Sequence, residues 1–399
     1  MTRFVPRMMA VFGAGVVAVA AAMASIEVGV RMRWDERRGM PGFYMSDPIL
    51  GQRLTPGYDG WFAGVPVRIN SLGFRDLRDY TVKKPAGTFR ILVFGDSVTF
   101  GHGALFETTY PFLLEARLKA WRPDVKWEVW NLSVPGYNTS QELAYLKEVG
   151  GRYDPDLVII GFYENDLADN AQELRPTWLA RARSAVQRTM QRWLYSYEFY
   201  RRVALTLRWR LTTDARDDGR LRELEGESVL LGRVEGAGDR PEQRLTEVEY
   251  LDDDAVNSFA CLEEAVGDAR ADSLVKRLRS TSGEVAAWRR AVAELQRLNR
   301  EGIHRVMFFI NMAPRICPDG DRFADGGSLQ DDETLSAVLG EGTHVASSTR
   351  AFLHYRPSQM PAASGHSIGN SNRVKAEVLF DYLKARVLPP LLSPMPASF

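Results

Sequence analysis

The stretch Arg90-Ile91-Leu92-Val93-Phe94-Gly95-Asp96-Ser97 joins a continuous apolar run to an abrupt polar stop. Four consecutive apolar residues ended by glycine are typical of a strand that is buried on both faces of a sheet. Such strands belong to parallel sheets, and Ser97 would follow this one on a tight turn.

The same pattern recurs along the chain. We expect a second strand at Trp127–Leu132 and further buried strands at Leu157–Gly161 and Arg305–Ile310. Helices are expected between and after them, over 109–121, from 139 toward 149, from 281 with apolar residues at 285, 288, 292, 295 and 298, and over 372–387. Two Thr-x-x-Glu capping boxes, at Thr139 and Thr281, are expected to begin two of these helices. Alternating strands and helices predict a three-layer α/β/α domain around a mainly parallel sheet.

The first thirty residues have a different character. Residues 8–26 contain neither charge nor proline, and nineteen helical residues span about 28 Å, close to the hydrocarbon thickness of a bilayer. The run predicts a signal-anchor transmembrane helix or a signal peptide, with 22–24 (Ala-Met-Ala) as a cleavage site. A buried helix of a soluble protein is the alternative. Arginines at 31, 33, 37 and 38 outnumber Arg3 and Arg7, which favours a cytoplasmic body.

These patterns divide the chain into four parts. Residues 1–30 are the anchor, 31–87 an irregular segment on the core, 88–170 with 282–390 the α/β domain, and 171–281 an insertion. The insertion begins rich in arginine and aromatic residues, which predicts helices, and continues as an acidic, glycine-containing linker. Its basic helices either pack on the sheet or lie on a membrane surface.

Composition narrows the classes of function. The 51 basic and 51 acidic residues give no net charge, which argues against a nucleic-acid partner. The sequence contains no phosphate-binding or dinucleotide-binding glycine pattern after a strand, so we expect no cofactor and no metal. The two cysteines, Cys261 and Cys317, form either one disulfide in an oxidising compartment or two unpaired thiols.

Polar residues follow the carboxyl ends of the predicted strands, which is the edge of an open α/β sheet where ligands bind. Ser97 follows the first strand, Gly136 the second and Asn165 the third, and His366 precedes the last helix. Acyl transfer needs this set, because a serine hydroxyl requires an imidazole to take its proton. The oxyanion that forms requires fixed donors, and the N–H groups of Ser97 and Gly136 with the Asn165 amide are candidates.

These residues resemble the four ordered blocks of the SGNH/GDSL hydrolase superfamily: 95–97 (Gly-Asp-Ser), Gly136, 165–166 (Asn-Asp) and His366. The resemblance implies a flavodoxin-like three-layer fold and a serine esterase. It makes Ser97 the nucleophile, His366 the base, and Ser97, Gly136 and Asn165 the oxyanion hole. Residues 67–75 (VRINSLGFR) also resemble membrane-anchored bacterial members found with envelope polysaccharide genes.

The sequence departs from the family pattern around the histidine. The family places an aspartate two or three residues before it, where this chain has Ser364 and Ala363, and a glycine five residues after it, where this chain has Ser371. Ser364 or a backbone carbonyl would then orient the imidazole, or an acid would arrive from elsewhere. His102 is an alternative base, since it follows Ser97 by five residues.

Three functions stay open at this point. The first is an esterase that removes acyl or acetyl groups from a carbohydrate or envelope substrate. The second is an acyltransferase with the same acyl-serine, and the third is an inactive binding module of a polysaccharide assembly system. For each of the three functions, the family resemblance implies an inner-membrane protein with a single span and a periplasmic body. The arginines after residue 30 favour the opposite orientation, with a cytoplasmic body.

Overall fold

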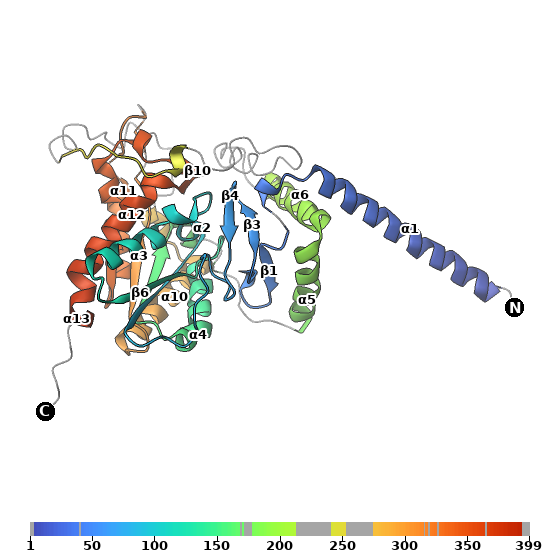
Figure 1. Ribbon diagram of the computed structural model, residues 1–399, viewed down its shortest axis with the longest axis horizontal. Helices are drawn as coiled ribbons and strands as arrows, with labels where there is room; N and C mark the ends of the chain where they lie inside the picture. Colours follow the sequence, from blue (N-terminus) through green and yellow to red (C-terminus); the bar gives the residue numbers. More distant parts are fainter. Residues whose placement is uncertain are drawn as a thin grey trace.

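Five parallel strands form the central sheet of the computed structural model, in the spatial order β6, β5, β7, β8, β9 (Figure 1). Their bounds are Thr88–Gly95 for β5, Lys126–Asn131 for β6, Leu157–Phe162 for β7, Val306–Ile310 for β8 and His344–Ser347 for β9. The predicted mainly parallel sheet is confirmed. The edge strand β9 was not predicted, because it is short and only one of its residues is buried.

The structure describes residues 4–39, 41–167, 170, 178–212, 241–252, 274–314, 316–317, 320–324, 327–363 and 365–392. Most of the predicted acidic linker therefore lies outside the described residues.

Helices cover both faces of the sheet and complete the three layers. Ile91 and Val93 of β5 share an apolar cluster with α3 (Tyr110–Trp121) and α12 (Gly369–Tyr382). Leu92 and Phe94 point to the other face, toward α4 (Thr139–Tyr153) and α10 (Gly283–Arg300). The alternation of side chains along a buried strand thus supplies two cores from one apolar run.

Two predicted helix starts were wrong by one residue. Asn138, not Thr139, caps α4: its side chain accepts from Gln141 N at 3.1 Å, and Gln141 Oε1 accepts from Asn138 N at 3.1 Å. Ser282, not Thr281, caps α10, by accepting from Val285 N. In both places a second polar residue beside the predicted threonine has the extended backbone that a cap requires.

The N-terminal segment predicted to be irregular contains two β-hairpins. They pair β1 (Tyr44–Asp47) with β2 (Gly51–Leu54), and β3 (Asp59–Phe62) with β4 (Val65–Arg68). Their buried apolar residues join the cluster on the α4 and α10 face of the sheet. The hairpins therefore extend the core toward the carboxyl ends of the strands.

Helix α1 (Phe4–Arg33) projects away from this body (Figure 1). Within the described residues, its stretch Phe12–Arg33 is the one helix long and apolar enough to cross a membrane, and almost none of it is buried. The basic region of the insertion forms α5 (Trp178–Trp193) and α6 (Tyr195–Thr212). These two helices pack mainly on β1 and α1 rather than on the central sheet.

Besides several 3₁₀ turns, the structure contains further short elements and the helices of the C-terminal part of the chain. They are α2 (Ser97–Phe100), α9 (Leu274–Leu278), α11 (Gly327–Leu339), the two-residue strands β10 (Ala362–Ala363) and β11 (His366–Ser367), a π-helical turn over Leu383–Val387, and α13 (Leu388–Leu392). Cys317 is buried and disulfide-bonded, while Cys261 lies outside the described residues.

Candidate active site

Ser97 begins α2 directly after β5. Asp96 caps this helix, because its carboxylate accepts from Val98 N at 2.9 Å. Gly95 allows α2 to sit so close to the strand, since a Cβ there would collide with the Thr99 side chain. The strand, the glycine and the cap together hold Ser97 at the carboxyl end of β5, the second strand of the sheet.

Buried hydrogen bonds fix α2 from the other side. Thr99 Oγ1 accepts from the Tyr110 hydroxyl at 3.0 Å and from Asn311 Nδ2 at 3.1 Å, and all three side chains are fully buried. Asn131 Nδ2 donates to Thr99 O at 3.2 Å. Residues from three other elements of the domain thus converge on the turn that carries Ser97.

His366 lies on the short hairpin of β10 and β11, not at the end of a sheet strand. Its Nε2 is 2.8 Å from Ser97 Oγ, which is within reach for proton transfer. The hairpin is tied to the start of α12 by two hydrogen bonds, from Ser371 Oγ to Pro361 O at 2.8 Å and from Asn372 Nδ2 to Ser367 O at 3.0 Å. Ser371, which replaces the family's glycine, therefore supports the histidine loop.

The three predicted oxyanion donors lie on neighbouring loops. Gly136 follows β6 with a φ of +83°, a backbone conformation that favours glycine, and its surface is exposed. Within the described residues, neither the Ser97 nor the Gly136 N–H donates to a protein acceptor. The Asn165 side chain, after β7, donates to the Asp96 carboxylate. Asp96 thereby connects the nucleophile turn to the third donor, a role that sequence analysis missed.

The predicted histidine-orienting residue, Ser364, lies outside the described residues. His102 is the alternative base. Within the described residues, its ring makes no hydrogen bond to Ser97 Oγ, which contacts Asp96 and His366 instead. The His102 ring stacks on the His366 ring, with centroids 4.3 Å apart and planes at 23°. The ring of Phe62 in β3 also contacts the His102 ring, edge to face, with centroids 5.1 Å apart.

Arg75 supports the loop that carries His102. Its guanidinium is fully buried and donates to the carbonyl oxygens of Phe100, Gly101 and Ala104 at 2.8, 2.6 and 2.6 Å. These carbonyls lie at the end of α2 and in the turn after it, where Gly101 O also accepts from Ala104 N and Phe100 O from Asn131 Nδ2. The stretch 67–75, noted for its family resemblance, thus stabilises the loop after the nucleophile.

The first hairpin holds the Gly136 loop. Gln52 Nε2 donates to Pro135 O at 2.9 Å, and the Tyr137 hydroxyl donates to Gln52 O at 2.6 Å. No local sequence signal marks Gln52, because its partners lie more than eighty residues away. The N-terminal segment is therefore part of the site's framework.

Beneath the site, four ionisable side chains are buried together. Burial raises the pKa of the Asp96, Glu142 and Asp166 carboxyl groups, and the three also repel one another as anions. Burial lowers the pKa of Lys375 to about 7, while the negative charge of Asp96 opposes that shift. Within the described part of the chain, both carboxyl oxygens of Glu142 lack a hydrogen-bond partner. We therefore expect Glu142 to keep its proton at pH values where an exposed glutamate has lost it.

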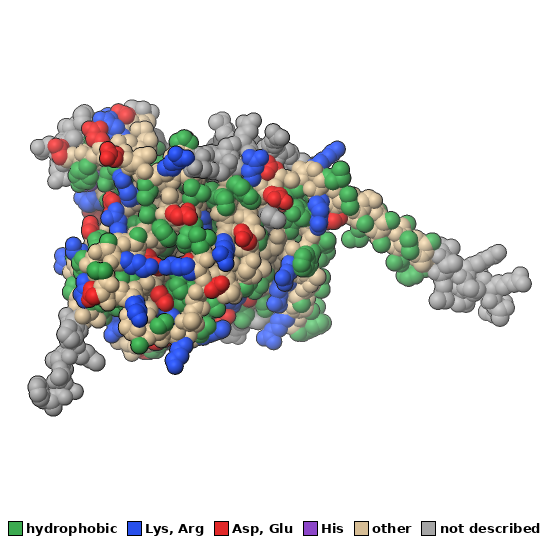
Figure 2. All heavy atoms as spheres, in the orientation of Figure 1, with side chains coloured by type: hydrophobic (Ala, Val, Ile, Leu, Met, Phe, Trp, Pro, Cys, Tyr) green, Lys and Arg blue, Asp and Glu red, His purple; other side chains and the backbone are tan. Residues whose placement is uncertain are grey.

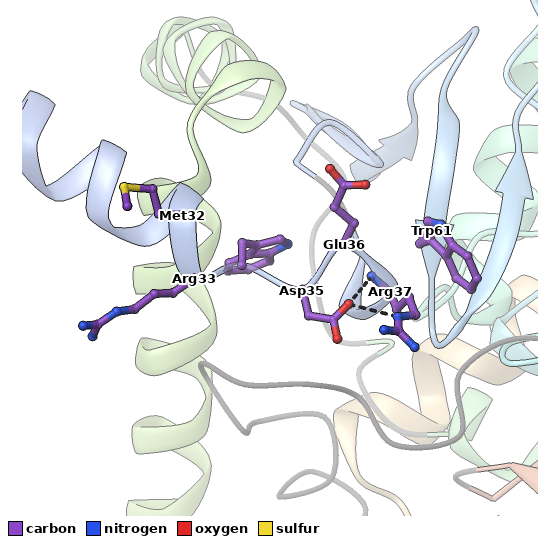
Figure 3. A pocket seen from close by; sticks show the side chains of 7 residues that line it. Met32, Arg33, Asp35, Glu36, Arg37 and Trp61 are labelled. Atoms are coloured by element: carbon purple, nitrogen blue, oxygen red, sulfur yellow. Dashed lines mark hydrogen bonds and ion pairs between the residues drawn. The ribbon is translucent and has the colours of Figure 1, made fainter.

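Two other features are separate from this site. Within the described residues, no group of three or more His, Cys, Asp or Glu side chains is arranged to hold a metal ion. A hollow at the base of α1 is lined by residues 32–37 and Trp61 of β3 (Figure 3) and includes none of the predicted catalytic residues.

The comparison with family models agrees with the resemblance seen in the motifs. Residues 91–197 match the model of the GDSL-like lipase/acylhydrolases. No curated protein matches the chain. Among solved structures, LAE5, an alpha/beta hydrolase from the metagenome of Lake Arreo, Spain, is 15% identical with a TM-score of 0.36, and the alignment covers 74% of this chain and 95% of that one. The acetylxylan esterase Axe2 of Geobacillus stearothermophilus is 13% identical with a TM-score of 0.36, covering 74% of this chain and 94% of that one.

Proposed function

We propose that the chain is a GDSL-type ester hydrolase that cleaves esters through an acyl-enzyme on Ser97, and the match of residues 91–197 to the GDSL-like lipase/acylhydrolase model supports this proposal. The observation that carries this proposal is the 2.8 Å contact between Ser97 Oγ and His366 Nε2. A serine that had lost its catalytic role would have no need of an imidazole nitrogen at this distance. The contact therefore favours an active enzyme over a binding module.

In the first half of the reaction, Ser97 Oγ attacks the ester carbonyl carbon and His366 Nε2 takes the Oγ proton. The tetrahedral oxyanion receives hydrogen bonds from the N–H groups of Ser97 and Gly136 and from the Asn165 amide. Its collapse breaks the bond to the alcohol, which leaves with the proton from His366. A water molecule then attacks the acyl-Ser97 carbonyl while His366 takes its proton; the bond between the acyl carbon and Oγ breaks, the carboxylic acid leaves, and His366 returns the proton to Oγ.

We further propose that the substrate is an O-acyl or O-acetyl ester of a carbohydrate in the cell envelope. The support is the resemblance of residues 67–75 to membrane-anchored members associated with envelope polysaccharides, and the buried role of Arg75 in that stretch. The proposal includes α1 as a single-pass inner-membrane anchor, with the body on the periplasmic side. The disulfide bond of Cys317 is typical of proteins in that oxidising compartment.

A fluorophosphonate probe that cannot cross membranes tests both the nucleophile and the location. We expect it to label the purified full chain in detergent and also the full chain in intact spheroplasts. Ser97→Ala should abolish labelling and the hydrolysis of an aryl acetate, because the attacking oxygen is gone. Ser336→Ala, on α11 and outside the site described above, is the matched control and should retain both.

The possible failures have different meanings. Full esterase activity in Ser97→Ala would show that another residue is the nucleophile. Labelling of the purified protein but not of intact spheroplasts would place the body in the cytoplasm. An unlabelled, inert, folded wild-type protein would favour the binding module.

A further inference from the structure

Helix α5 turns its polar side toward the protein. Ser184 is buried, and Gln187 and Gln191 are partly buried beside it. All three contact Ser46 of β1: Ser46 N donates to Gln191 Oε1 at 2.8 Å, and Ser46 Oγ lies 3.1 Å from Ser184 Oγ and 3.2 Å from Gln187 Oε1. The attachment of α5 to the body is therefore made by hydrogen bonds.

The apolar side of α5 points outward. Trp178 is 75% exposed, Val186 62% and Trp193 62%, with Leu179 also exposed. At about 100° per residue these side chains fall within one stripe, roughly opposite the three polar residues. A helix that packs against a soluble core has the reverse arrangement. The stripe therefore lacks a partner within the described residues.

Arginines border this stripe. Arg181, Arg183, Arg188 and Arg192 are all exposed, and α5 contains no acidic residue. Figure 2 shows basic and hydrophobic side chains next to each other over α5, at the edge of the body from which α1 leaves. A tryptophan-containing apolar face flanked by arginines is typical of helices that lie in the surface of an anionic bilayer.

Helix α5 is also joined directly to the membrane helix. Arg31 Nη2 of α1 donates to Trp193 O, the last residue of α5, at 3.0 Å. Glu27 of α1 accepts from Tyr195 N at 3.0 Å and from Ser196 N at 2.8 Å, at the start of α6. The C-terminal end of α5, with the exposed Trp193, therefore lies beside the C-terminal end of the stretch Phe12–Arg33, which is long enough to cross a bilayer.

We propose that α5 lies in the headgroup region of the bilayer that α1 enters, with its tryptophans in the acyl boundary and its arginines on anionic lipid phosphates. Charge complementarity and the direct continuity with α1 select a lipid surface over a second protein. The proposal rests on the membrane placement of α1 and is independent of the ester chemistry.

Depth-dependent quenching tests this placement. The full chain is reconstituted without reductant in vesicles of phosphatidylglycerol and phosphatidylcholine that contain lipids with a nitroxide near the top of the acyl chain for positions 186 and 303, or near its end for position 17. A fluorophore is attached at Val186→Cys, at Val17→Cys in α1 (68% exposed), or at Ile303→Cys in the loop before β8 (52% exposed). We expect strong quenching at positions 17 and 186 and little at 303. In phosphatidylcholine alone, quenching at 186 should fall at least about twofold, because the arginines lose their anionic partners.

Each alternative result has a distinct consequence. Quenching at 17 but not at 186 would overturn the proposal, including the case in which a second copy or another protein shields position 186 from water. No quenching at 17 would overturn the membrane placement of α1 on which the proposal rests. Equal quenching at 186 in both lipids would overturn the role of the arginines. Aryl acetate hydrolysis, measured on the same samples, reports the proposed esterase separately.

Discussion

Helices α5 and α10 are both strongly amphipathic, yet they face opposite ways. α10 buries its apolar side against the sheet through Val285, Trp288, Val292, Leu295 and Leu298. α5 presents its apolar side outward and hydrogen-bonds to the body through Ser184, Gln187 and Gln191. An amphipathic pattern thus identifies the apolar face of a helix, but it does not show whether that face packs against the protein core or points outward.

The largest contrast should come from removing one tryptophan from each helix. Trp288 is fully buried, so Trp288→Ala should lower the free energy of unfolding by about 3–5 kcal/mol. Trp178→Ala should change it by less than about 0.5 kcal/mol, because the side chain is exposed. Denaturant unfolding of both variants in detergent measures this difference. A large loss in Trp178→Ala would mean that α5 has a protein partner for its outer face.

A third helix, α4, shows what a buried polar group does without a partner. The raised pKa of Glu142 means that the unfolded chain releases this proton at lower pH than the folded chain does. The contribution of Glu142 to stability is therefore complete below about pH 4.5 and declines as pH rises toward its folded pKa. In Glu142→Gln, stability should fall less steeply with pH, by up to about 1.4 kcal/mol per pH unit in this range. Thermal unfolding from about pH 5 to about pH 8 tests this, and identical slopes in variant and wild type would contradict a buried, protonated Glu142.

The smallest effect concerns the polar attachment of α5. Gln191→Ala leaves Ser46 N without its acceptor, at a cost of about 1 kcal/mol. Hydrogen exchange at the Ser46 amide should then accelerate about fivefold if exchange follows local opening. Thr189→Ala, on the exposed side of α5, is the control. Unchanged exchange in Gln191→Ala would show that other contacts hold α5 on the hairpin.

The parts of the fold that were predicted from sequence are those that a short local pattern determines. The strands β5, β7 and β8 contain continuous apolar runs, and such runs have few alternative environments, whereas β6 has Glu128 between its apolar residues. β9 was missed because its exposure varies along four residues, and the N-terminal hairpins because their strands alternate too briefly to show a period. The orientation of α5 depends on its hydrogen bonds to Ser46 of β1, which the sequence of α5 alone does not predict.

In the candidate site too, some residues could be predicted from local patterns, whereas the tertiary contacts could not. Ser97, Gly136 and Asn165 could be placed together because each follows a buried strand of one parallel sheet. His366 was grouped with them only from its position before the last helix, since it lies on a two-residue strand of a short hairpin and does not follow a strand of the sheet. The contacts of Asp96 with Asn165, of Gln52 with Pro135 and of His102 with His366 are tertiary, and no spacing along the chain predicts them.

The hydrogen bonds of Glu27 and Arg31 to the start of α6 and the end of α5 also determine how the enzyme would search for substrate. A catalytic domain on a flexible linker explores a hemisphere above the membrane and meets substrates at many heights. If α1 is the anchor that we propose, these hydrogen bonds tie it to the body, and Ser97 would move in a plane parallel to the bilayer. Substrates would be selected by the height at which their acyl groups are presented, as well as by their chemistry.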